Sequence, residues 1–169
     1  MKWTTIVLIL LLACAAKAPA QVSPPATATV AISGKKLTIS YSAPSMRGRK
    51  IMGALVPYGR WWRTGADNAT TLQTEADLDM GGLKVPKGTY TIYTLPGATE
   101  WQLIVNKQTG QWGTEYNQRQ DLGRVKMNLA QTPALVDSLK IDLSSTGGNK
   151  GLLKMTWERT EVSVPFTVQ

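Results

Sequence analysis

The chain has 169 residues, which is enough for one domain with a proper core and too few for two ordinary domains. It contains no histidine and a single cysteine, Cys14, so Ser-His-Asp and Cys-His mechanisms and an ordinary zinc site are excluded. Lys and Arg outnumber Asp and Glu by 19 to 11, but the basic residues are scattered, which indicates a solvated basic surface and no nucleic-acid binding.

The N-terminus has the pattern of a secretory signal peptide. Lys2 is followed by the apolar run 6–13 and then by small residues that end in Ala18-Pro19-Ala20. This apolar run is shorter than the roughly 20 residues that a membrane-spanning helix needs. We therefore predict a signal peptide over residues 1–20 and a single domain over residues 21–169, exported to the periplasm or the cell exterior.

Cys14 provides an alternative to simple export. The run Leu11-Leu12-Ala13-Cys14 resembles the lipobox of bacterial lipoproteins, in which the cysteine carries a lipid anchor. Cleavage after Ala20 is favoured because Cys14 lies unusually close to the start for a lipobox. Either way the folded domain has no disulfide, because the chain has no second cysteine.

Short segments of alternating apolar and polar residues, separated by turns rich in Gly and Pro, dominate the remaining chain. The segments predicted as strands are 27–32, 37–41, 70–75, 77–80, 83–85, 89–95, 101–106, 122–129, 135–143, 152–157 and 162–168. No helical period of useful length is present. The pattern predicts an all-β protein, an antiparallel β-sandwich or jelly-roll-like single domain, with Trp157 in its core.

Two stretches, 41–71 and 107–121, do not alternate cleanly. Long irregular loops in compact domains are often functional, so these stretches are where a site is expected. The first contains four arginines, the pair Trp61-Trp62 and one carboxylate, Asp67.

Five residues of the first stretch are the main candidates for ligand binding: Trp61, Trp62, Arg63, Asp67 and Asn68. In extended backbone neighbouring side chains point opposite ways, so one indole is expected to face outward as a platform for a sugar ring or another flat ligand. Arg63 and Asn68 would then supply hydrogen bonds. The competing interpretation, which we favour, pairs Arg63 with Asp67 as a structural clamp across the turn.

Further candidates flank this group. Arg47 and Arg49 could bind a phosphate or carboxylate beside Gly48, although solvated loop charges are the simpler interpretation. Trp112 and Tyr116, from the second stretch, could add another wall to the same cleft. Glu115 with Asp67 would form the carboxylate pair that glycoside hydrolysis requires.

Several motifs together resemble one known family. RGRKIMGALVPYG followed by WRTGA, and then PKGTYTIYTLPG, WQLIVNK and QWG, are similar to the bacterial domain-of-unknown-function 2911 family over roughly residues 23–168. The resemblance implies a secreted or envelope-located all-β domain. It implies no activity, because none is attached to the family.

The expected function is that of a non-enzymatic binding or accessory domain of the cell envelope, without metal or cofactor. Its partner would be a polar small molecule or an envelope protein, bound at the loop 47–68. A carboxylate-dependent, glycoside-type hydrolase is the alternative enzyme class, and a purely structural envelope protein is the third possibility. A pocket that joins the candidate residues would favour the first two.

Overall fold

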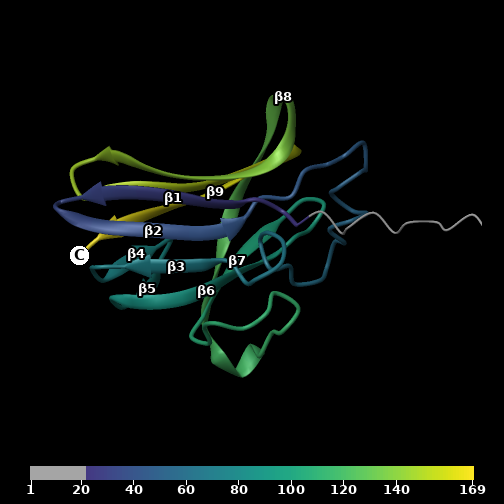
Figure 1. The fold of residues 1–169 in the computed structure, drawn as a ribbon. Coiled ribbons are helices and arrows are strands. Elements are labelled where there is room, and N and C mark those ends of the chain that lie inside the picture. The colour runs from purple at the N-terminus through teal and green to yellow at the C-terminus, as the bar shows by residue number, and fades with distance from the viewer. Residues whose placement is uncertain (1–21) are drawn as a thin grey trace, which may run out of the picture.

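A computed structural model describes residues 22–169, in which nine strands and one short 3-10 helix are formed (Figure 1). The strands are β1 (Pro25–Ile32), β2 (Lys35–Ser42), β3 (Thr71–Thr74), β4 (Leu78–Met80), β5 (Leu83–Val85), β6 (Gly88–Leu95), β7 (Trp101–Asn106), β8 (Asp121–Gly147) and β9 (Lys150–Val168), and the helix η1 spans Gln118–Gln120. The predicted signal peptide and Cys14 lie outside the described residues. Within residues 22–169, no helix has the length and apolar character needed to cross a membrane.

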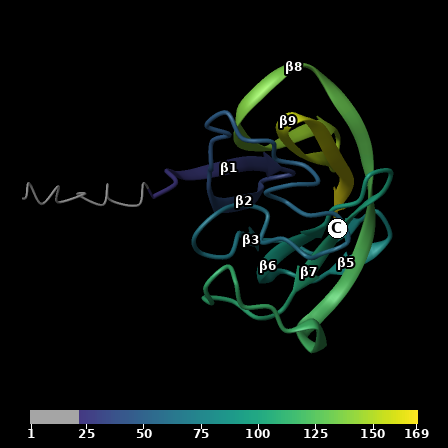
Figure 2. The same ribbon diagram turned by 90° about the vertical axis from the view of Figure 1, so that its right-hand side faces the viewer.

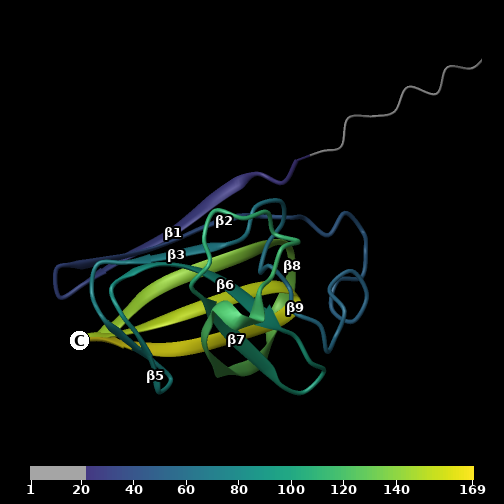
Figure 3. The same cartoon turned by 90° about the horizontal axis from the view of Figure 1, so that it is seen from below.

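All neighbouring strands are antiparallel and form one sheet with the order β1-β2-β3-β6-β7-β8-β9-β4-β5. The sheet folds over on itself because β8 belongs to both layers. Its first residues, up to Met127, pair with β7, and from Asn128 onward it pairs with β9. Figure 2 shows β8 running up the side of the molecule from one layer to the other, and Figure 3 shows β8 and β9 lying side by side. The predicted all-β, sandwich-like fold is therefore confirmed.

The C-terminal part of the chain differs in detail from the prediction. The four expected strands over residues 122–168 are two long strands, β8 and β9, each interrupted by irregular register. The buried positions of β9 are 153, 155 and 157 before the irregularity and 162, 164, 166 and 168 after it. Glu158, whose φ of 57° lies in the left-handed region, is at this change of face. The alternation in the sequence was correct on both sides, but the two alternating segments form one strand, and the extra residues of the irregular pairing lie opposite, in β8.

The core lies between the two layers, as expected. Trp157 is 1% exposed, and its indole N–H donates to the carbonyl of Asp137 at 3.0 Å. The predicted burial of Trp157 is thus confirmed. The loop 43–70, which connects β2 to β3, covers the end of the molecule opposite the C-terminus (Figure 1).

Candidate functional site

The loop 43–70 is held in place by strands distant in sequence. Its Ile51 and Met52 are buried, and their backbone N–H groups donate to the two carboxylate oxygens of Glu158 at 3.4 and 2.9 Å. Further along, the backbone of Trp62 exchanges two hydrogen bonds with Thr94 of β6. These bonds make the loop a fixed part of the domain, on which side chains have defined positions.

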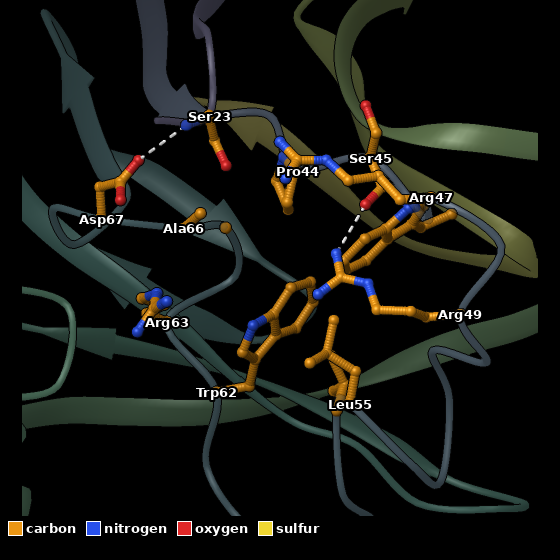
Figure 4. Close-up of a pocket in the computed structure, with 13 residues that line it drawn as sticks. Ser23, Pro44, Ser45, Arg47, Arg49, Leu55, Trp62, Arg63, Ala66 and Asp67 are labelled. Carbon is orange, nitrogen blue, oxygen red and sulfur yellow. Dashed lines mark hydrogen bonds between the residues drawn. The ribbon is translucent and has the colours of Figure 1, made fainter. Parts of the chain in front are cut away.

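A cavity of about 350 Å³ lies on the inner side of this loop (Figure 4). Its lining combines residues from the loop with residues from the N-terminal lead-in and β9: Ser23, Pro44, Ser45, Arg47, Arg49, Leu55, Val56, Trp62, Arg63, Gly65, Ala66, Asp67 and Trp157. Three arginines and one carboxylate are therefore brought together. We call this cavity the arginine pocket.

Aromatic packing forms one wall of the arginine pocket. The ring of Trp62 stacks on that of Trp157, with centroids 5.8 Å apart and planes 19° from parallel. Because Trp157 is part of the core, the orientation of Trp62 is set by the fold. Leu55, which is 47% exposed, adds a second apolar surface to the lining.

Arg49 is positioned in the pocket by the backbone of its own loop. Its Nε donates to the carbonyl of Met46 and its Nη2 to the carbonyl of Ser45, both at 2.9 Å. Figure 4 shows the guanidinium of Arg49 extending toward Trp62. A guanidinium has more donors than these two bonds use, so N–H groups remain to bind a ligand. Arg49 is thus a positioned cation and not a freely moving surface charge.

The favoured Arg63–Asp67 clamp is wrong. Among residues 22–169 no ion pair joins the two side chains, and a carboxylate oxygen of Asp67 instead accepts a hydrogen bond from the backbone N–H of Ser23 at 3.3 Å. The stem of Arg63 packs against Gly113, where an added Cβ would meet Arg63 Cδ. Thr64 and Asp67 both have left-handed backbone, with φ of 57° and 55°, so the turn between Arg63 and Asp67 is not a regular helical or extended one.

Arg63 consequently has a free charge. Its Nε is buried and has no hydrogen-bond partner within the described residues. A buried unpaired donor costs about 1–3 kcal/mol, so it requires an explanation. The carboxylate that does fasten the loop is Glu158, more than a hundred positions away from the residues it binds. No local signal in the sequence could have identified it.

Trp61 and Tyr116 lie apart from the lining of the arginine pocket. Trp61 packs edge-on against Tyr93 at 5.6 Å and tilted against Tyr116 at 5.0 Å, while its neighbour Trp62 contacts Trp157. The expected opposite orientation of the two indoles is therefore what the structure shows. Trp61, 37% exposed, is supported on the tyrosines, so it serves to anchor the loop more than to present a free platform.

The tyrosines belong to a hydrogen-bond network at the base of the loop 107–120. Tyr116 donates to a carboxylate oxygen of Asp121 at 2.7 Å, and Arg124 donates to the hydroxyl of Tyr116 at 2.9 Å and to Asp121 at 3.1 Å. Asn106 donates to the second oxygen of Asp121 at 2.8 Å. Burial, followed by the hydrogen bond to Asp121, raises the pKa of Tyr116 to about 12. Every charge in this network has a partner.

Trp112 and Asn68 are joined through their backbones. The two residues form an isolated antiparallel bridge, and the N–H of Gly113 donates to the carbonyl of Asp67 at 3.0 Å. Both side chains are exposed, Trp112 to 48%. They therefore border the arginine pocket without lining it. Glu115 is also exposed and outside the lining, so it does not face Asp67 across the pocket.

Sequence reasoning missed several lining residues. Ser23 lies outside every predicted strand and both candidate stretches, and Trp157 was expected only in the core, whereas both line the pocket. Leu55 belongs to the stretch 41–71, but no feature of the sequence indicated that its side chain lines a cavity. Arg47, Arg49, Trp62, Arg63 and Asp67 are the predicted residues that the structure brings together.

Residues 23–166 match the model of a family described as protein of unknown function, DUF2911. A search of curated proteins found no match, and a search of solved structures found none either. Because the family match covers nearly the whole chain, this protein belongs to the DUF2911 family.

Proposed function

We propose that this protein is a non-enzymatic, exported binding domain, and that the arginine pocket binds an anionic group of a polar ligand. One observation carries the proposal. Three arginines line a cavity whose lining contains one carboxylate, and that carboxylate, Asp67, accepts a backbone hydrogen bond from Ser23. The pocket is therefore left with an excess of positive charge.

The geometry suits a carboxylate or a phosphate. Guanidinium groups bind such planar or multidentate anions through charge-assisted hydrogen bonds, which are stronger than neutral ones. Arg49 is already oriented by two carbonyl groups, so little side-chain entropy is lost when it binds. The buried Nε of Arg63 has no hydrogen-bond partner, and its guanidinium has no ion pair among the described residues, so a bound anion would supply its counter-charge.

The hydrolase alternative draws no support from the same pocket. Glycoside hydrolysis uses two carboxyl groups that flank the substrate at a defined separation. Among the described residues that line the pocket, Asp67 is the one carboxylate, and Glu115 belongs to the exposed loop beyond it. Binding without chemistry therefore explains the lining with fewer assumptions.

Titration with phosphate and with acetate at low salt, followed through the arginine side-chain N–H signals in NMR spectra, tests the proposal. We expect the signals of Arg49 and Arg63 to shift saturably. Arg49→Gln and Arg63→Gln should each weaken binding by about tenfold, since each removes charge-assisted hydrogen bonds. Arg60→Gln is the matched control, because it removes the same charge from an exposed residue outside the pocket.

Two results would overturn the proposal. The first is that neither anion shifts the signals of Arg49 or Arg63. The second is that the Arg60 variant loses as much affinity as the pocket variants. The second result would show that general surface charge, and no particular site, attracts the anion.

Export is part of the proposal and rests on the sequence of residues 1–20. Mass spectrometry of the protein from its native cell envelope should find a mature chain that begins at Gln21. A lipid-modified peptide that begins at Cys14 would instead establish the lipoprotein alternative, and a chain that retains Met1 would contradict export by either route.

A further inference from the structure

Trp112 is a large aromatic residue with no evident packing role. It is 48% exposed, and the described residues form no ring-to-ring contact with it. Single exposed apolar residues are common, so its position is what matters. Its backbone is bridged to Asn68, and the next residue, Gly113, contacts the stem of Arg63. An exposed indole thus lies directly beside the arginine pocket.

The segment that carries Trp112 is firmly held. Its neighbour Gln111 is buried, and the side-chain amide of Gln111 donates to the hydroxyls of Tyr93 at 2.7 Å and Thr91 at 3.1 Å. The carbonyl of Gln111 also accepts a hydrogen bond from the N–H of Ala69 at 3.4 Å. The backbone under Trp112 is therefore fixed on β6 and on the pocket loop, as a preorganised binding surface requires.

The surroundings of the pocket combine charge with flat apolar surfaces. Within the lining, Arg49 lies next to the indole of Trp62, and Leu55 completes an apolar wall (Figure 4). Outside it, Asn68 is exposed and is bridged through its backbone to Trp112, next to Asp67 of the lining. A free inorganic anion would use the arginines alone. A ligand that used all of these groups would carry an anion, hydroxyl groups and flat apolar faces.

Sugar acids have this combination. The faces of a pyranose ring present C–H groups that stack on aromatic rings, while its hydroxyls bond to amides and its carboxylate to guanidinium groups. We propose that the ligand of the arginine pocket is an acidic oligosaccharide. A uronate carboxylate is bound by Arg49 and Arg63, and the adjoining sugar ring stacks on Trp112. This inference rests on the proposed function and adds the class of ligand.

Calorimetric titration with a galacturonate oligosaccharide tests the inference, with three comparison ligands: the galacturonate monomer, the methyl-esterified oligosaccharide and polyglutamate. We expect Trp112→Ala to weaken oligosaccharide binding by about tenfold, from the loss of one stacked ring, and to change monomer binding by less than about twofold. Trp112→Phe should restore most of the affinity. Leu135→Ala, at an exposed apolar residue of β8, is the matched control and should bind like the wild type.

The comparison ligands separate the possible failures. If the monomer binds but Trp112→Ala leaves oligosaccharide binding unchanged, the inference is wrong and the anion pocket stands. If polyglutamate binds as tightly as the uronate oligosaccharide, the ligand is an acidic peptide and the inference is again wrong. Equal binding of the methyl-esterified form would remove the role of the carboxylate, and with it the proposed function. Because Trp112 is exposed, Trp112→Ala should melt like the wild type, so a loss of binding will not reflect unfolding.

Discussion

The two irregular loops differ in how their polar side chains are bonded. At the base of the loop 107–120, polar side chains form hydrogen bonds with one another. In the loop 43–70, Arg49 bonds to backbone carbonyls and Arg63 has no ion pair among the described residues. At the base of the first, Asp121 accepts hydrogen bonds from Asn106, Tyr116 and Arg124. In the second, Arg49 bonds to two carbonyls, and the buried Nε of Arg63 has no partner. Both loops are irregular and rich in aromatic residues, so composition alone does not distinguish them.

This difference indicates what each loop does. A polar cluster whose members satisfy one another stabilises the fold and has little left to offer a ligand. A cluster with excess charge lowers stability unless something binds there, and proteins retain such costs at functional sites. Substitutions that remove the contacts holding each loop test this comparison. They follow in order of the expected loss in unfolding free energy, the largest first.

Trp157→Ala should have the largest effect on stability, because it removes the buried support beneath Trp62. Truncation of a large aromatic core residue costs about 3–5 kcal/mol of unfolding free energy, through lost burial and the cavity left behind. Chemical denaturation of the two proteins measures the change. A loss under about 1 kcal/mol would mean that Trp157 does not carry the core and that Trp62 is held by other contacts.

Asp121→Ala should break the network at the base of the loop 107–120. It removes the acceptor for three side chains, and the fully buried amide of Asn106 loses its charged acceptor and keeps only its bond to the carbonyl of Asn117. We expect a loss of about 1.5–3 kcal/mol in a denaturant melt. Anion binding at the arginine pocket should stay within about twofold of wild type, and a melt that matches wild type would show that this network does not stabilise the fold.

Arg63→Ala should cost little stability, in contrast with Asp121→Ala. Without an ion pair to break, the loss should stay under about 1 kcal/mol, and the same holds for Asp67→Ala. The double variant should then equal the sum of the two single variants within about 0.5 kcal/mol. A large single loss that is partly recovered in the double variant would restore the clamp and contradict the free charge on Arg63.

Tyr116 should titrate late, because its pKa is raised from 10.0 to about 12 by burial and by the hydrogen bond to Asp121. The folded state holds this proton more tightly than the unfolded state. The resulting stability is therefore fully present below pH 10 and is lost as the pH rises through about 12. Burial also raises the pKa values of Tyr90 and Tyr93, so alkaline titration of tyrosinate absorbance should show several late-titrating tyrosines, of which Tyr116→Phe removes the one near pH 12. Unchanged late titration in that variant would assign this step to another tyrosine.

The sequence alone was sufficient for the fold class, most strand positions and the stretch that lines the arginine pocket. Strand alternation is a local property, so Leu153, Met155 and Trp157 identified a buried face without knowledge of their partners. The irregular composition of the stretch 41–71 likewise marked the loop that lines the pocket. The family match over residues 23–166 confirmed the resemblance of its motifs.

Only the tertiary structure decided which charges meet. A sequence separation of four suggested that Arg63 and Asp67 pair, but Asp67 accepts a hydrogen bond from Ser23, a residue 44 positions away. Glu158 fastens Ile51 and Met52 from the point in β9 where the buried face changes, opposite the irregular pairing of β8, and there two alternations that each looked complete meet in one strand. Hydrogen bonds between distant residues depend on the register of strands that the sequence does not display. For this reason the loop that lines the arginine pocket could be identified from local composition, whereas the excess charge of the pocket followed from the fold.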